Sequence, residues 1–144
     1  MAKRTSETVK RAFSARWSPQ TIEAAQRRAA TTEIAFNQLI ERYAREGLAM
    51  DAHPLICFRD RANGRRAMLI GSRLDVAAMI ATIRQNDGSV SEAAAYLELP
   101  IAKVEACVAY YVDHQDEIDE QIARDDAAAA DAESTWRRSH EIFA

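Results

Sequence analysis

The sequence predicts a mainly α-helical protein that begins with one short strand and carries one small β-hairpin. Three observations lead to this fold class. Residues 10–17 alternate between apolar and polar side chains, which is typical of a half-buried strand. From Pro19 onward most apolar residues recur at helical spacing. Between these helical segments, Asn63-Gly64 separates two short apolar runs, which is a strong hairpin signal.

The N-terminal strand is expected to pair with a second copy of the chain. Phe13, Ala15 and Trp17 fall on one side of it, and the other side carries Lys10, Ala12, Ser14 and Arg16. A lone strand leaves its edges and its apolar face uncovered, and no second strand follows nearby. Two copies paired antiparallel would bury the aromatic side and present the polar side. Such a ribbon fits the DNA major groove.

Two helices are predicted after this strand. Ser18 is a good helix cap and Pro19 suits the first helical position. Thr31-Thr32 is expected to end the first helix. The second helix is predicted to run to about Glu46 and to stop at Gly47.

Phe13-Ser14-Ala15-Arg16-Trp17, followed by Pro19 and later by Asn37-Gln38-Leu39-Ile40, resembles the ribbon-helix-helix DNA-binding proteins of the Arc, MetJ and CopG type. The resemblance covers roughly residues 8–50. It implies a domain at 1–50 for dimerisation and DNA binding. Glu33-Ile34-Ala35 departs from the family pattern, which leaves Thr31 or Thr32 as the candidate phosphate clamp of the second helix. The residues assigned to DNA are Lys3, Arg4, Lys10, Ala12, Ser14 and Arg16.

A second domain is predicted at residues 51–112. Asp51-Ala52-His53-Pro54 is expected to be a linker, and strands at 55–59 and 65–70 should form the hairpin. A helix from Asp75, a short helix capped by Ser89 or Ser91, and a longer helix after Pro100 then form a helix-turn-helix-like unit.

This second segment resembles a small bacterial domain carried by VapB-type antitoxins. The resemblance is carried by Gly71-Ser72-Arg73-Leu74-Asp75-Val76, Ser91-Glu92-Ala93-Ala94, Leu99-Pro100, Val104-Glu105-Ala106, Tyr110-Tyr111, His114 and Glu117-Ile118-Asp119. It implies a partner toxin, a PIN-like ribonuclease. The helix after Pro100 offers Lys103 as its only early cation, with Glu98 and Glu105 close by, so we expect it to contact protein rather than DNA. The hairpin arginines 61, 65 and 66 are a better basic cluster, although a solvated turn is the default interpretation of them.

An acidic helix is predicted at residues 113–144. This segment holds three Arg against ten Asp and Glu, whereas residues 1–50 hold nine Lys and Arg against five Glu. A basic head favours a polyanion partner, and an acidic tail disfavours one. The tail's aromatic side chains either anchor a partner or pack back on the second domain. The residues assigned to toxin binding are Ile122, Trp136, Arg137, Arg138 and Phe143.

Composition and motifs argue against other classes of function. No Gly-rich phosphate loop or Ser-His-Asp or Cys-His arrangement is present, so we do not expect an enzyme or a cofactor. His53 and Cys57 lack further ligands nearby, so no metal site is predicted. The sequence shows no apolar run that could span a bilayer and no secretory signal, which favours a cytoplasmic protein with two reduced cysteines and no membrane partner.

The sequence therefore predicts an antitoxin that binds its operator DNA as a dimer, or a higher oligomer, and neutralises a PIN-like ribonuclease. The alternative is a stand-alone ribbon-helix-helix transcriptional regulator with no toxin partner. A third possibility, from another class, is an interaction protein whose ribbon only dimerises. The sequence itself specifies neither the operator nor the toxin.

Overall fold

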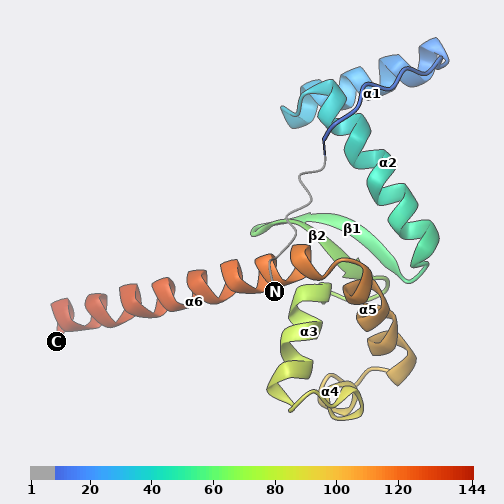
Figure 1. The fold of residues 1–144 in the computed structure, drawn as a ribbon. Helices are drawn as coiled ribbons and strands as arrows, with labels where there is room; N and C mark the ends of the chain where they lie inside the picture. Colours follow the sequence, from blue (N-terminus) through green and yellow to red (C-terminus); the bar gives the residue numbers. More distant parts are fainter. Residues whose placement is uncertain (1–8) are drawn as a thin grey trace. The chain divides into compact units, whose positions relative to one another are not determined.

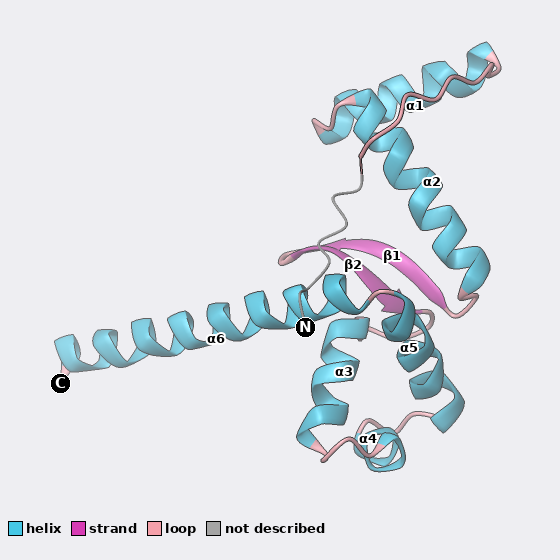
Figure 2. Cartoon of the chain, viewed as in Figure 1, coloured by secondary structure: helices cyan, strands magenta, loops and turns pink. Residues whose placement is uncertain are grey.

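A computed structural model describes residues 9–144. Its order is α1 (Pro19–Thr32), α2 (Phe36–Ala52), β1 (Ile56–Arg61), β2 (Gly64–Leu69), α3 (Val76–Gln85), α4 (Val90–Tyr96), α5 (Ile101–Asp113) and α6 (Gln115–Phe143). The described chain is thus mainly helical with one two-stranded antiparallel sheet, which confirms the predicted fold class at this level (Figure 2).

The chain divides into two compact units, Met1–Tyr43 and Ala44–Ala144. The boundary between the two units lies inside α2. The predicted end of α2 near Glu46 was wrong. Gly47 does not stop α2, which continues to Ala52. A glycine inside a helix costs only about 1 kcal/mol. The last turns of α2 offset that cost because Ala49 joins the core of the second unit and buried Glu46 pairs with Arg65.

The first unit has a small core. Ser18 caps α1, because its side-chain oxygen accepts a hydrogen bond from the backbone of Thr21, and Pro19 follows at the first helical position. Between α1 and the start of α2, only Ala25, Ala29 and Leu39 are buried. Three such side chains are few for an independently stable unit, since small domains depend on burying most of their apolar surface.

The hairpin forms where it was predicted, with β1 and β2 in antiparallel register from Ile56↔Leu69 to Arg61↔Gly64. Ala62 and Asn63 make the two-residue turn. Gly64 follows the turn with a φ of +104°, a conformation that a residue with a Cβ rarely adopts. The Asn-Gly signal therefore predicted the hairpin correctly, and its glycine is the first residue after the turn.

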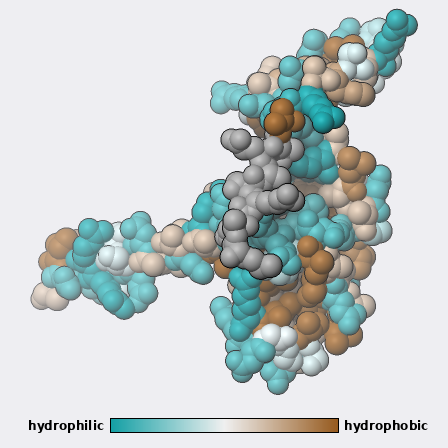
Figure 3. Space-filling view, in the orientation of Figure 1, coloured by the Kyte–Doolittle hydropathy of each residue, from teal (hydrophilic) through white to brown (hydrophobic). Residues whose placement is uncertain are grey.

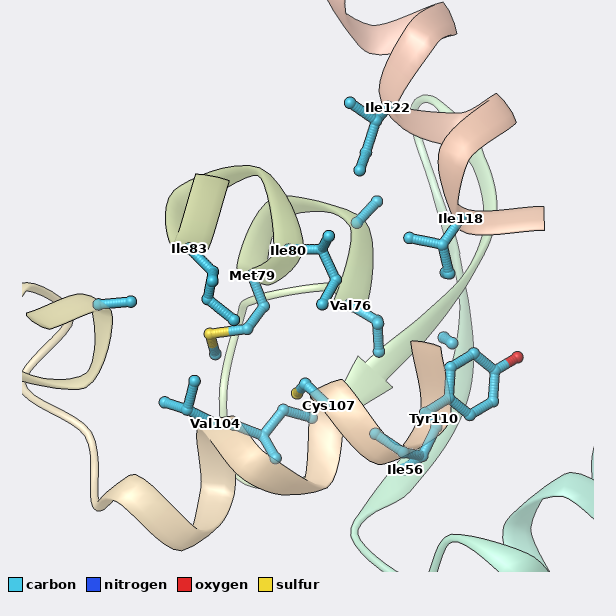
Figure 4. Packing of buried hydrophobic residues seen from close by; sticks show 14 of the residues in the cluster. Ile56, Val76, Met79, Ile80, Ile83, Val104, Cys107, Tyr110, Ile118 and Ile122 are labelled. Carbon is cyan, nitrogen blue, oxygen red and sulfur yellow. The ribbon is translucent and has the colours of Figure 1, made fainter. Parts of the chain in front are cut away.

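The main hydrophobic core belongs to the second unit. It joins the hairpin, α3, α4, α5 and the first turns of α6 (Figure 4). Ile56 and Leu69 enter from the strands, and Met79, Tyr110 and Ile118 from three helices. Asp75 caps α3, which begins where the sequence predicts, and Ser89, one of the two predicted candidates, caps α4. The helices α3, α4 and α5 thus pack on one core.

Three helix ends in the described chain carry an acidic residue in the left-handed conformation. Glu33 follows α1 with a φ of 55°, Asp87 lies just past α3 with 54°, and Glu98 lies just past α4 with 54°. Glycine is the residue that adopts this conformation without strain. These three exposed positions therefore carry a local conformational cost.

Burial makes Cys107 a reporter of unfolding. The thiol is fully buried, and this burial raises its pKa to about 11. Because the raised pKa belongs to the folded state, the stability linked to it is present below the ordinary thiol pKa and is lost as pH rises towards 11. In a Cys57→Ser chain at pH 8, we expect iodoacetamide to modify Cys107 only when the second unit unfolds. Equal labelling rates in buffer and in urea would contradict this.

Candidate functional site

The expected DNA-reading segment is extended and exposed. Residues 9–18 form neither helix nor strand within one chain, and no segment among residues 19–144 pairs with them. The side chain of Phe13 is 91% exposed and that of Trp17 is 41% exposed. Two aromatic residues thus lie on the surface beside a small core, and burial of each would contribute about 1.5–3 kcal/mol. Pairing of this segment with a second copy stays a prediction.

The residues assigned to DNA differ in their surroundings. Ala12, Ser14 and Arg16 are exposed. Lys10 is exposed too, and its ammonium group lies 3.2 Å from the carboxylate of Glu41 on α2. An exposed pair of this kind contributes little to stability, so Lys10 is free to exchange Glu41 for a phosphate. Lys3 and Arg4 lie outside the described residues.

The candidate phosphate clamp of α2 is not formed by either threonine. Thr31 and Thr32 are the last residues of α1, and their hydroxyls donate to the carbonyls of Arg27 and Arg28. The first turn of α2 instead starts from Ala35, whose carbonyl accepts from the amide of Leu39 and whose side chain has no polar group. The start of α2 therefore offers an anion its backbone amides but no hydroxyl cap.

The basic cluster of the hairpin is largely neutralised by carboxylates. Arg65 pairs with buried Glu46 at 2.7 Å and with Asp60 at 3.4 Å, and Glu46 raises the pKa of Arg65. Arg61 donates to the carbonyl of Arg73 at 2.9 Å. At the start of α5, Lys103 is half-buried and Glu105 is exposed. Of the three hairpin arginines, Arg61 is the one without a carboxylate partner among the described residues, so both surfaces offer few free cations for phosphate.

Arg66 fastens α6 to the hairpin. Its side chain is only 2% exposed and makes two hydrogen bonds with Asp125, at 2.7 and 3.0 Å. It also donates to the carbonyl of Asn63 and to Gln121. A buried cation requires such partners because its transfer from water is costly. Arg66 and Asp125 are 59 positions apart in the sequence, so no local pattern indicates this contact.

We expect Asp125→Ala to lower the free energy of unfolding by about 2–3 kcal/mol, because it leaves buried Arg66 without its carboxylate. Urea denaturation followed by circular dichroism measures this change. Asp126→Ala is the matched control, since Asp126 is exposed and forms no ion pair with residues 9–144. Equal stability of the two variants would show that Arg66 finds another partner.

Beyond Asp125 the helix α6 is exposed. Every side chain from residue 126 to 138 is accessible, and Figure 1 shows this part of α6 extending away from α3 and α5. Trp136 is 59% exposed and Phe143 is 89% exposed. Hydrophobic residues gather at the end of the helix in Figure 3, where Ile142 and Phe143 lie. Trp136 and Phe143 therefore do not pack on the hydrophobic core of the second unit.

The residues assigned to a toxin are only partly brought together. Arg137 and Arg138 lie on the exposed helix beside Trp136, and Arg137 donates to Glu133 one turn earlier. Ile122, in contrast, is buried in the core with Ile118, so its side chain is not presented on this surface. Ile122 is buried because the apolar face of α6 covers the core only over the first turns of the helix and then extends past it.

A cluster of aromatic and titratable groups at the α5–α6 junction was missed from the sequence. Tyr110 stacks on His114, with ring centroids 4.2 Å apart, and contacts His53 edge-on at 5.3 Å. His53 also lies 2.8 Å from a carboxylate oxygen of Asp113. Burial and nearby Glu117 raise the pKa of Tyr110. His53 and His114 are 61 residues apart in the sequence, so spacing gave no signal for this contact.

Among residues 9–144, no group of three or more His, Cys, Asp or Glu side chains is placed to hold a metal ion. Over the same residues, no helix has the length and apolar character needed to cross a membrane. Comparisons of the chain with protein-family models, curated proteins and solved structures find no match.

Proposed function

We propose that the chain is a dimeric DNA-binding antitoxin that acts in the cytoplasm. In this proposal two copies of residues 9–18 pair as an antiparallel ribbon whose outer side reads operator DNA. The exposed half of α6 then holds and inhibits a PIN-like ribonuclease. The observation that carries the first part is the exposure of Phe13 and Trp17 in an extended segment beside a three-residue core.

The exposed half of α6 supports the second part. It presents Trp136, Arg137 and Phe143 outside the hydrophobic core. The contacts of Trp136 with His140 and of Arg137 with Glu133 both lie within the helix itself. Aromatic and arginine side chains dominate the binding energy of protein interfaces. The net negative charge of residues 113–144 keeps this helix off DNA and favours a basic protein surface, such as one that attracts RNA.

Two measurements test the proposal. Fluorescence anisotropy compares binding to the DNA upstream of the chain's own gene with binding to a scrambled duplex. Co-expression with the neighbouring gene product, followed by co-purification, tests the toxin. Specific DNA binding without a co-purifying partner favours the stand-alone regulator. Absence of DNA binding leaves only an interaction protein.

Arg16 is expected to provide base specificity. An arginine can make a two-pronged contact with guanine, which discriminates by roughly 1–3 kcal/mol per site. Arg16→Ala should therefore lower operator affinity towards that for scrambled DNA while the dimer stays folded. Lys10→Ala is the contrast, since loss of a phosphate contact should weaken binding to every sequence and flatten its salt dependence. Unchanged operator affinity of Arg16→Ala at matched salt would contradict the outward orientation of Arg16.

A further inference from the structure

One face of α6 changes from buried to exposed along the helix. Ile118 and Ile122 cover the core, and Ala129, Trp136 and Phe143 continue the same face at helical spacing beyond it. From residue 126 to 143 this exposed half is roughly 27 Å long at 1.5 Å per residue. The face is therefore continuous with an established packing surface but has no cover within the chain's second unit.

The charges beside this face are ordered along the helix. With 3.6 residues per turn, Asp126, Glu133 and Arg137 fall on the same flank of the Trp136 face. The carboxylates come first along the chain and the guanidinium follows. A flank with this order is complementary to its own reversed copy, because reversal places the cation opposite the acids.

We propose that the exposed half of α6 pairs antiparallel with the same segment of a second copy. A two-fold axis perpendicular to the helices brings identical flanks together. Full overlap of residues 126–143 places this axis near residues 134 and 135, and Glu133 of each copy then lies opposite Arg137 of the other. Trp136 of one chain approaches Trp136 of the other. Phe143 of each chain lies over the alanine-rich turn of the other chain that includes Ala129.

Parallel pairing lacks this complementarity. It would set the charged flank of one helix against the opposite flank of the other, where Ala128, Thr135 and Ser139 offer no charge. It would also place Phe143 against Phe143 and leave the alanines facing each other. Large side chains opposite small ones pack better than large opposite large. The antiparallel pair covers the face that the proposed toxin would use, so the two partners exclude each other.

Distances between labelled chains test the arrangement. In a full-length Cys57→Ser background, Ala127→Cys or Glu141→Cys introduces an exposed thiol for a spin label, while Cys107 stays buried. Antiparallel pairing places position 127 of one chain level with about position 141 of the other. The 127–141 distance between chains should therefore be shorter than the 127–127 and 141–141 distances. The reverse order, or no distance between α6 helices, overturns the proposal.

Charge substitutions test the contact itself. Arg137→Glu and Glu133→Arg should each abolish the 127–141 distance between chains, because like charges then meet across the axis. An equimolar mixture of the two variants should restore it. Each chain of the mixture keeps like charges along its own helix, so recovery cannot come from repaired helix stability. Distances that persist in both single variants, or a mixture without recovery, contradict the pairing.

The aromatic face provides the last control. Trp136→Ala should abolish the distance, whereas Ser134→Ala, on the opposite side of the helix, should preserve it. We expect the second unit to stay folded in every variant, because residues 126–138 make no part of its core, and circular dichroism measures this. If the Trp136 face of α6 becomes inaccessible to solvent only after a partner protein is added, that result overturns self-pairing in favour of that partner.

Discussion

Trp17→Ala is expected to dissociate the dimer and to abolish DNA binding. In the proposed ribbon Trp17 is buried in both copies, so one substitution removes two aromatic side chains. At about 1.5–3 kcal/mol for each, the dimer should lose roughly 3–6 kcal/mol, or more than a hundred-fold in its association constant. Sedimentation equilibrium over a micromolar concentration range measures this loss. Phe13→Ala should act in the same direction.

Ser14→Ala is the matched control, because Ser14 belongs to the same extended segment and falls on the outward side. It should dissociate no more readily than the parent. A Trp17→Ala chain that keeps the parent's mass at low micromolar concentration would place the dimer contact elsewhere, or show that the chain is a monomer.

Removal of residues 127–144 is expected to release the toxin and leave operator binding within a few-fold of the parent. The cut follows Asp126 because an earlier one would remove Asp125 and leave Arg66 buried without its carboxylate. Trp136→Ala should reproduce much of the effect. Truncating a buried interface tryptophan commonly costs about 2 kcal/mol or more, roughly thirty-fold in affinity. Inhibition of the co-purified ribonuclease measures the loss.

Ser134→Ala, two residues earlier, is the control for the tryptophan substitution. A shortened chain that still neutralises the toxin at equal stoichiometry would move the binding surface into residues 52–122. The self-pairing of α6 could then hold independently, because its test uses no toxin.

The elements that could be predicted are those with local causes. Ser18, Asp75 and Ser89 cap helices that start within one residue of each. The Asn63-Gly64 signal predicted the hairpin correctly, because Gly64, the first residue after the turn, adopts a positive φ without strain. Such features depend on side chains a few positions apart, which a sequence displays directly.

The contacts that could not be predicted join distant segments. Gly47 is a helix end by local rules, but burial of Ala49 carries α2 past it. Arg66 looked like a solvated turn residue until Asp125 was brought to it from α6. Ile122 and Trp136 share one face of α6. Ile122 is buried and Trp136 is exposed because the core ends before the helix does.

The acidic residues in left-handed conformation have a consequence for engineering. Glu33, Asp87 and Glu98 each combine backbone strain with a negative charge near a helix C-terminus, where the helix dipole disfavours anions. Glycine or asparagine at these positions would remove both costs, each change adding of the order of 1 kcal/mol. All three lie outside the ribbon segment and outside the exposed half of α6. Such substitutions would therefore raise the thermal stability of the chain without changing the ribbon segment or the exposed half of α6.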